Sequence, residues 1–342
     1  MLLRTLAAPI NPADVNTVQG TYGVKPTFSS LIGTPEPSTI PGNEGVFEVV
    51  TSEGSGAASA LKPGDWVIPA RTGFGTWRTH AVAPADDLIR VDRDGLAPLQ
   101  AATVAVNPCS AYRMLRDFVG EGTGGADGAP LREGDWFLQN GANSGVGRAA
   151  IQLGRLWGLR SINVIRARPT AEETQRLRDE LAALGATHVV TEEELTSRDF
   201  GFARRAAEWT RGAGGGGLRL ALNCVGGKSA QALARALAPG GVMVTYGGMS
   251  RQPVALPTGL LIFRDLRLRG FWLSRWADRD RAAKEHTVRE ILGYVRDGRF
   301  ADAPVDPVPW SWDTPDADLA AAVQGTLAGF RAGKGVFVFG ET

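Results

Sequence analysis

Gly141-Ala142-Asn143-Ser144-Gly145-Val146-Gly147 is the stretch that decides the fold, because it joins a predicted strand to a predicted helix. The dinucleotide-binding pattern G-x-G-x-x-G falls on Ala142, Ser144 and Gly147, so small residues replace two of its three glycines. Small side chains still let the backbone approach a pyrophosphate, and the start of a helix offers free N–H groups to it. A glycine turn that only packs a strand on a helix would explain this stretch about as well.

Predicted strands and helices alternate around this turn. The predicted strands are Trp136 to Asn140, Ser161 to Ile165, His188 to Thr191, Leu218 to Val225 and Val242 to Tyr246, with Arg267 to Leu273 as a further candidate. Helical patterns cover Thr170 to Leu184 and Ser229 to Leu237. This alternation predicts a doubly wound parallel sheet with helices on both faces, which is a Rossmann domain.

The beginning and the end of the chain are β-rich instead. Short runs such as Val46 to Val50 and Trp66 to Ala70 are bounded by turn residues, and Gly335 to Gly340 is typical of a closing strand. We therefore predict an α/β protein in which 1–106 and 303–342 form a β-rich domain and 107–302 form the Rossmann domain. The glycine-rich segments 120–130 and 212–217 are interpreted as surface loops.

The strand end after the glycine-rich turn indicates which cofactor is bound. NAD-binding chains carry an acid about 20 residues after the glycine pattern, where it binds the ribose 2′-hydroxyl. Here that place is taken by Arg166-Ala167-Arg168, which has two arginines and no acid. Guanidinium groups can hold a 2′-phosphate through charge-assisted hydrogen bonds, so we predict NADPH. Solvated arginines at a strand end are the alternative.

Composition excludes several classes of protein. The 342 residues contain 37 Lys and Arg against 36 Asp and Glu, a net charge of +1 that gives no support to a chain-wide polyanion-binding surface. Two cysteines, Cys109 and Cys224, can build neither a disulfide framework nor a four-cysteine zinc site, and we expect both to be small buried residues. No apolar run reaches the about 18 residues of a membrane span.

This predicted organisation is that of the medium-chain dehydrogenase/reductases, which have a β-rich first domain, a Rossmann domain and a chain end that returns to the first domain. The zinc alcohol dehydrogenases among them use a histidine in a G-H-E-G segment, where this chain reads Gly42-Asn43-Glu44-Gly45. Asparagine is a poor zinc ligand, so no metal site is expected.

Several longer strings resemble one family, the mitochondrial 2-enoyl thioester reductases (trans-2-enoyl-CoA or acyl-carrier-protein reductases), a zinc-free branch of that superfamily. These strings are Ala7 to Asp14, Gln19 to Gly23, Gly42 to Gly45, Asn107 to Met114, Gln139 to Gly147, Tyr246 to Ser250 and Gly270 to Leu273. The resemblance covers nearly the whole chain and implies a GroES-like catalytic domain beside the Rossmann domain.

The resemblance also implies an activity and a set of site residues. The activity is NADPH-dependent reduction of the C2=C3 bond of trans-2-enoyl thioesters in fatty acid synthesis, with hydride to C3 and a proton to C2. The catalytic tyrosine falls on Tyr22. The cofactor contacts fall on Asn107, Asn143, Ser144, Gly145, Val146, Arg166, Ala167, Arg168, Tyr246, Gly247, Gly248, Met249, Phe271, Trp272, Leu273 and Lys334.

Tyr22 suits the proposed chemistry. A phenol keeps its proton at neutral pH, so it can protonate C2 or hydrogen-bond the enolate oxygen of the thioester. Its setting in Gly20-Thr21-Tyr22-Gly23 is typical of a loop that presents a side chain to a cleft. Residue type alone would favour a loop tyrosine packed over the edge of its domain.

Partners and location follow from charge and from the resemblance. Between Arg264 and Lys284 lie seven basic and three acidic residues, which could meet the phosphates of coenzyme A or an acidic acyl carrier protein, although a solvated helix face explains them too. The resemblance implies a homodimer and a mitochondrial location, with a cytoplasmic one as the alternative. The chain starts inside the motif-bearing region, so we expect the leading strands and presequence of the family to be missing from it.

Two other functions remain open at this point. An NADPH-dependent quinone reductase would share the glycine pattern and have no need for Tyr22 as a proton donor. A non-catalytic NADPH-binding protein would bind the cofactor without turning over any enoyl thioester.

Overall fold

The computed structural model describes residues 1–30, 32–51, 61–119, 130–211, 217–328 and 333–340. The chain divides into two compact units, of which the first comprises Met1–Cys109 with Leu273–Thr342 and the second Ser110–Trp272. Residues 273–302, which the sequence analysis placed in the Rossmann domain, therefore group with the first unit by their contacts. The limits of the functional domains stay a prediction. The two predicted glycine-rich loops lie outside the described residues, except for their last positions.

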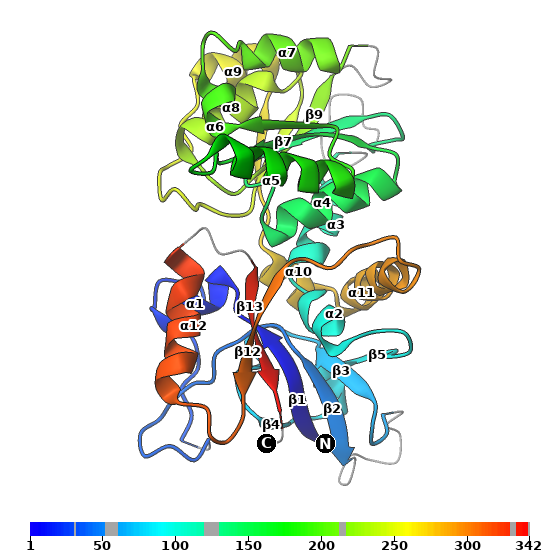
Figure 1. Cartoon of the computed structure of the whole chain (residues 1–342), viewed down its shortest axis with the longest axis vertical. Helices are drawn as coiled ribbons and strands as arrows, with labels where there is room; N and C mark the ends of the chain where they lie inside the picture. The colour runs from blue at the N-terminus through cyan, green and yellow to red at the C-terminus, as the bar shows by residue number, and fades with distance from the viewer. Residues whose placement is uncertain (31, 52–60, 120–129, 212–216, 329–332, 341–342) are drawn as a thin grey trace. The chain divides into compact units, whose positions relative to one another are not determined.

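The second unit is built on a six-stranded parallel sheet (Figure 1). The strands, in spatial order, are β11 (Arg267–Gly270), β10 (Val242–Thr245), β9 (Leu218–Asn223), β6 (Trp136–Gln139), β7 (Arg160–Ile165) and β8 (His188–Thr191). Numbered from β6 along the chain, this order is the 3-2-1-4-5-6 arrangement of dinucleotide-binding domains read from its other end. The predicted doubly wound sheet is confirmed.

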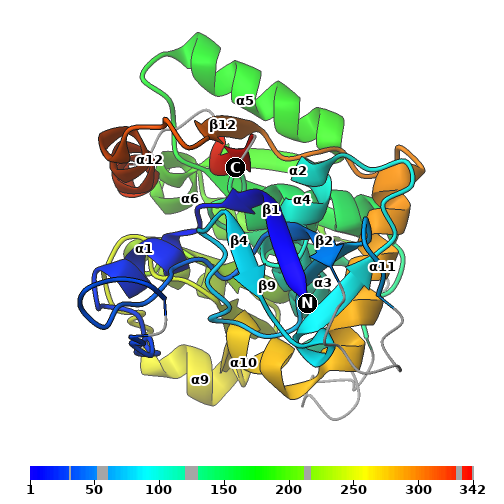
Figure 2. The same cartoon turned by 90° about the horizontal axis from the view of Figure 1, so that it is seen from below.

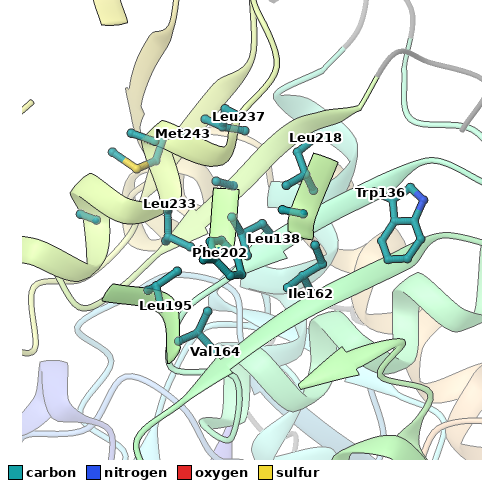
Figure 3. Packing of buried hydrophobic residues seen from close by; sticks show 14 of the residues in the cluster. Trp136, Leu138, Ile162, Val164, Leu195, Phe202, Leu218, Leu233, Leu237 and Met243 are labelled. Atoms are coloured by element: carbon teal, nitrogen blue, oxygen red, sulfur yellow. The ribbon is translucent and has the colours of Figure 1, made fainter. Parts of the chain in front are cut away.

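Helices cover both faces of this sheet, as Figure 1 shows. They are α4 (Gly145–Leu156) and α5 (Ala171–Leu184) on one face, and α6 (Glu192–Thr196), α7 (Phe202–Trp209) and α8 (Gly227–Ala236) on the other, with α3 (Asn107–Asp117) and α9 (Thr258–Arg264) completing the set. Figure 3 shows Leu138 and Ile162 of the sheet packed with Phe202 and Leu233 of the helices. Burial of these apolar side chains stabilises the layers.

The first unit contains a seven-stranded sheet. Six strands follow in the order β12 (Val305–Trp310), β13 (Lys334–Phe339), β1 (Leu2–Pro9), β2 (Val46–Thr51), β3 (Trp66–Pro69) and β5 (Leu88–Val91), and β4 (His80–Val82) pairs with β1. Strand β1 runs antiparallel to β2, β4 and β13, and Figure 2 shows β1, β2 and β4 side by side. The first residues of the chain therefore lie in the middle of this sheet.

The helices of the first unit are α1 (Pro12–Val18), α2 (Pro98–Thr103), α10 (Leu273–Arg279), α11 (Arg281–Arg296) and α12 (Asp316–Ala328), with a short 3-10 helix at Ala85–Asp87. The charged sequence around Asp280 to Arg296 predicts α11, whereas the sequence patterns did not predict the others. The side chain of Asp280 accepts a 2.9 Å hydrogen bond from the Ala283 N–H and caps α11. The predicted strand Arg267 to Leu273 ends at Gly270, because Leu273 already begins α10. Among the described helices, none combines the length and the apolar character needed to cross a bilayer.

Candidate cofactor and catalytic sites

The glycine-rich turn brings α4 close to the strand that precedes it. The Ser144 hydroxyl accepts a 3.1 Å hydrogen bond from the Gly147 N–H and caps the helix. A Cβ atom at Gly147 would lie 2.4 Å from the carbonyl oxygen of Ala142, so only glycine fits at this third position of the pattern. Gly141 has a φ of +59°, which favours glycine in the turn itself. The start of α4 therefore presents its unpaired N–H groups beyond the end of β6.

A buried amide network that sequence reasoning missed supports this turn. Gln139 donates from Nε2 to the Gly147 carbonyl at 3.0 Å and to the Asn163 side-chain oxygen at 2.7 Å. Asn140 donates from Nδ2 to the side-chain oxygen of Asn223 at 2.9 Å and accepts from the Cys224 N–H at 2.8 Å. Polar residues at the ends of otherwise apolar strands were the signal in the sequence. These bonds join the end of β6 to Asn163 within β7 and to the end of β9.

The two arginines predicted to select NADPH follow β7 directly. The backbone N–H of Arg168 donates a 2.9 Å hydrogen bond to the Thr174 hydroxyl, which fixes the loop after the strand. Partial burial lowers the pKa of Arg168, and the neighbouring Arg166 charge lowers it further. Glu192 has its pKa raised by burial, and the positive charge of Arg166 opposes that shift. Two guanidinium groups thus lie close together at the end of β7, where the 2′-phosphate was predicted to bind.

Tyr246, the first predicted residue after β10, lies beside the glycine-rich turn. Tyr246 has a buried hydroxyl beside the Cys224 thiol and the Ser144 side chain, and no hydrogen bond of good geometry ties it to a described residue. Burial raises the pKa of Tyr246 well above its usual range and that of Cys224 to about 11. The Met249 N–H donates to the Cys224 carbonyl at 2.9 Å, and the Met249 side chain is exposed. Gly247 follows Tyr246, and a Cβ atom added to it would lie 3.3 Å from Cys224.

Phe271 and Trp272 follow β11. The Phe271 N–H donates to the Thr245 carbonyl at 3.0 Å, and its ring meets that of Phe118 edge-on at 5.9 Å. Trp272 is exposed. Because β6, β7, β9, β10 and β11 are parallel, all the predicted cofactor residues of the second unit follow strand ends at one edge of the sheet.

The remaining predicted residues, Tyr22, Asn107, Leu273 and Lys334, belong to the first unit. Tyr22 is half-buried in the loop after α1, and its N–H donates to the Asn16 carbonyl at 3.1 Å. That carbonyl also accepts from the Thr21 N–H at 2.9 Å. Asn107 begins α3 and Leu273 begins α10. The end of α1 therefore fixes the backbone that carries the Tyr22 side chain.

A buried polar cluster holds the beginning of α1. Asp14 accepts from the Asn11 N–H at 2.9 Å and from the Asn43 side chain at 2.7 Å, and Glu44 accepts from the Asn11 side chain at 3.0 Å. Lys334 donates from Nζ to the Asn11 side-chain oxygen. Burial raises the pKa values of both carboxyls and lowers that of Lys334, while the attraction between Lys334 and the two acids opposes all three shifts.

The G-N-E-G segment is part of this cluster. Asn43 donates to Asp14, and its side-chain oxygen accepts from the Gly73 N–H at 2.7 Å. Both polar side chains of the segment thus have protein partners. Cys109 and Cys224 are buried, as predicted. Within the described parts of the chain, no three or more His, Cys, Asp or Glu side chains form a group that could hold a metal ion.

The sheet order, the capped glycine turn and the small residues around it define a dinucleotide-binding dehydrogenase domain. The zinc-binding dehydrogenase family matches residues 145–287 of the chain. The mitochondrial enoyl-acyl-carrier-protein reductase of Yarrowia lipolytica is 48% identical over 90% of this chain and 74% of its own length. The human mitochondrial enoyl-acyl-carrier-protein reductase is 44% identical over 97% of this chain and 79% of its own length.

Solved structures agree with these relatives. A complex of Etr1p with NADP and crotonyl-CoA has a TM-score of 0.87 and 39% identity, covering 98% of this chain and 90% of the other. The Etr1p/Etr2p heterodimer of Candida tropicalis, a mitochondrial 2-enoyl thioester reductase, matches with the same values. The chain belongs to the mitochondrial enoyl-acyl-carrier-protein reductase family, within the medium-chain dehydrogenase/reductases, with a GroES-like and a Rossmann domain.

Proposed function

We propose that this protein reduces the C2=C3 bond of trans-2-enoyl thioesters, carried on coenzyme A or acyl carrier protein, with NADPH as the reductant. The observation that carries the proposal is the likeness, over 98% of the chain, to a reductase structure that contains NADP and crotonyl-CoA. When bound, NADPH supplies a hydride for C3, and a proton must then reach C2. Fatty acid synthesis in mitochondria is the setting that the relatives favour.

The residues of the second unit fit the cofactor. The capped start of α4, with Asn143, Ser144, Gly145 and Val146, offers N–H groups and small side chains to a pyrophosphate. The buried Tyr246 hydroxyl has a proton to donate, and Gly247, Gly248 and Met249 continue from it. Arg166, Ala167 and Arg168 would hold the 2′-phosphate, and Phe271 and Trp272 complete the contacts of this unit.

Three residues of the first unit complete the proposed cofactor contacts. These are Asn107 and Leu273, at the starts of α3 and α10, and Lys334 at the start of β13. Lys334 already donates to Asn11. An ammonium group has three N–H donors, so a second acceptor on the cofactor is compatible with this contact.

Tyr22 is the proposed proton donor. Its backbone is held by the Asn16 carbonyl at the end of α1, which limits the positions open to the phenol. A neutral phenol can hydrogen-bond the enolate oxygen that develops on the thioester or pass its proton to C2. We assign no second acid–base group, because Tyr22 suffices for one proton transfer.

A homodimer is proposed on the strength of an exposed apolar edge. Ile262 and Phe263 of α9 are 66% and 84% exposed, and Leu268 of β11, the edge strand of the parallel sheet, is 44% exposed. Large apolar side chains left exposed on neighbouring elements are typical of protein interaction sites. A second copy of this chain is the proposed occupant, although the Candida tropicalis relative is described as a heterodimer.

The decisive assay measures NADPH oxidation with crotonyl and 2-hexenoyl thioesters and, in parallel, with a simple quinone. The proposal predicts saturable turnover of the thioesters and a saturated acyl product. Turnover of the quinone alone would identify a quinone reductase. Tight NADPH binding without turnover of any thioester would identify a cofactor-binding protein that is not a reductase.

A further inference from the structure

Arg148, in the first turn of α4, is a third arginine near the predicted 2′-phosphate site. Its side chain is only 12% exposed, which is low for an arginine. The Nε group donates to the Asn143 carbonyl of the glycine-rich turn at 3.3 Å. The Nη2 group pairs with the Glu180 carboxylate of α5 at 2.8 Å. The guanidinium is thus held in place between the turn and the neighbouring helix.

The charges around Arg148 connect it to the arginines after β7. Glu180, its partner, also attracts Arg168, and the charges of Arg148 and Arg166 both lower the pKa of Arg168. Helix α4 packs on both β7 and α5, and the Ala142 N–H just before α4 donates to the Val164 carbonyl near the end of β7 at 3.0 Å, so the start of α4 lies beside the end of β7. Arg148, Arg166 and Arg168 therefore lie on two adjacent segments of one compact unit, and the charges of Arg148, Arg166 and Glu180 all act on Arg168.

We propose that Arg148 is a specificity-determining residue that completes, with Arg166 and Arg168, a three-guanidinium site for the 2′-phosphate of NADPH, and that Glu180 takes the place of that phosphate when no cofactor is bound. This inference rests on the proposed use of NADPH and adds two residues, Arg148 and Glu180, to the proposed cofactor site. Sequence reasoning did not single out Arg148 or Glu180.

Electrostatics explains why the arrangement would select a phosphate. Like charges in a partly buried place repel, so a cluster of three guanidinium groups gains from a nearby anion. Glu180 supplies one negative charge and is 57% exposed, so its carboxylate can move into solvent at small cost. A phosphate carries more charge and three strong acceptor oxygens, and Arg148 can bind it in the fork geometry that suits a guanidinium.

The test uses ligands that differ only in the phosphate. We would measure by calorimetry the dissociation constants of adenosine 2′,5′-bisphosphate and 5′-AMP, and of NADPH and NADH, for Arg148→Gln. Loss of one charge-assisted contact should weaken the two 2′-phosphorylated ligands roughly tenfold to a hundredfold and leave the other two within about twofold. Arg204→Gln, which removes the same charge from an exposed site on α7, is the matched control and should change none of them.

Glu180→Gln should have the opposite effect on binding. Without its competing carboxylate, the 2′-phosphorylated ligands should bind several-fold more tightly, and 5′-AMP and NADH should be unaffected. If the Arg148–Glu180 ion pair only joins α4 to α5, the two variants should change the affinities for all four ligands equally or not at all. That result would overturn the proposal. Failure of the wild-type protein to prefer NADPH over NADH would instead overturn the proposed cofactor, so the two failures are distinguishable.

Discussion

The side-chain amide of Asn11 donates a 3.0 Å hydrogen bond to one oxygen of the buried Glu44 carboxylate, and the other oxygen accepts from the Val106 N–H at 2.7 Å. Lys334, which lies close enough to stabilise the charge of Glu44, also donates to Asn11. Glu44 thereby joins α1, β13 and the segment before α3. The cluster fixes the start of the helix whose other end carries Tyr22.

Replacing Glu44 should therefore destabilise the first unit. Glu44→Ala removes the carboxylate that accepts from the Asn11 amide and the Val106 N–H, and it takes away one of the two acids that attract Lys334. We expect the free energy of unfolding to fall by about 3–5 kcal/mol. Glu44→Gln keeps the shape and one acceptor and should cost less. Urea unfolding of the three proteins measures the difference, and an alanine variant within about 0.5 kcal/mol of the wild type would contradict the role of the cluster.

His188 should make the second unit sensitive to acid. Its ring is stacked between Trp136, at a centroid distance of 5.6 Å, and Trp209, at 4.2 Å. Burial lowers the pKa of His188 from 6.5. A folded pKa below the unfolded one means that His188 contributes stability above pH 6.5 and loses it as the pH falls through the lowered pKa.

The comparison is with His188→Phe, which keeps an aromatic ring between the tryptophans and cannot be protonated. Thermal unfolding of both proteins between about pH 7.5 and pH 5 measures the effect. We expect the stability of the variant relative to the wild type to rise as the pH falls. A difference that stays constant over this range would show that His188 does not titrate differently on unfolding.

The arginines after β7 should control the choice of cofactor. Replacing both Arg166 and Arg168 with Ala removes two charged donors from the predicted 2′-phosphate site. The KM for NADPH should rise far more than that for NADH, since NADH has no phosphate at this position. Steady-state kinetics with each cofactor at saturating enoyl thioester measures both values. Equal increases for the two cofactors would remove these arginines from the selection.

Tyr22→Phe should separate catalysis from cofactor binding. The variant loses only the phenolic hydroxyl, so turnover of an enoyl thioester should fall roughly 10²–10⁴-fold. The dissociation constant of NADPH should stay close to that of the wild type, because the proposed adenosine contacts belong to the second unit. Turnover numbers together with fluorescence titrations of NADPH test this. A variant with nearly full turnover would exclude Tyr22 as the proton donor.

The parallel sheet could be predicted from sequence because its strands are apolar runs that alternate with helical patterns around the glycine-rich turn. His188 to Thr191 was placed at the observed strand limits, and the helix from Thr170 begins after that residue because its hydroxyl caps the Glu173 N–H. The polar clusters could not be predicted in the same way. Asn140 and Asn223 are 83 residues apart, and nothing in local periodicity indicates that the two amides meet.

Charged side chains gave the least local signal. Arg148 and Glu180 lie on two helices and read as ordinary solvated residues, because a helical pattern does not say which polar residue meets the next helix. Likewise the pairing of Lys334 with Asn11 joins the two ends of the chain. Such contacts depend on how the strands are ordered, which the fold determines and short motifs do not.

The central claim is that hydride passes from NADPH to C3 of an enoyl thioester while C2 takes a proton. The most direct measurement uses NADPH that carries deuterium at its transferable C4 position, with crotonyl-CoA in ordinary water, and locates the label in the product by mass spectrometry and NMR. The account predicts butyryl-CoA with one deuterium at C3 and none at C2. A product without deuterium, or with deuterium at C2, would contradict it.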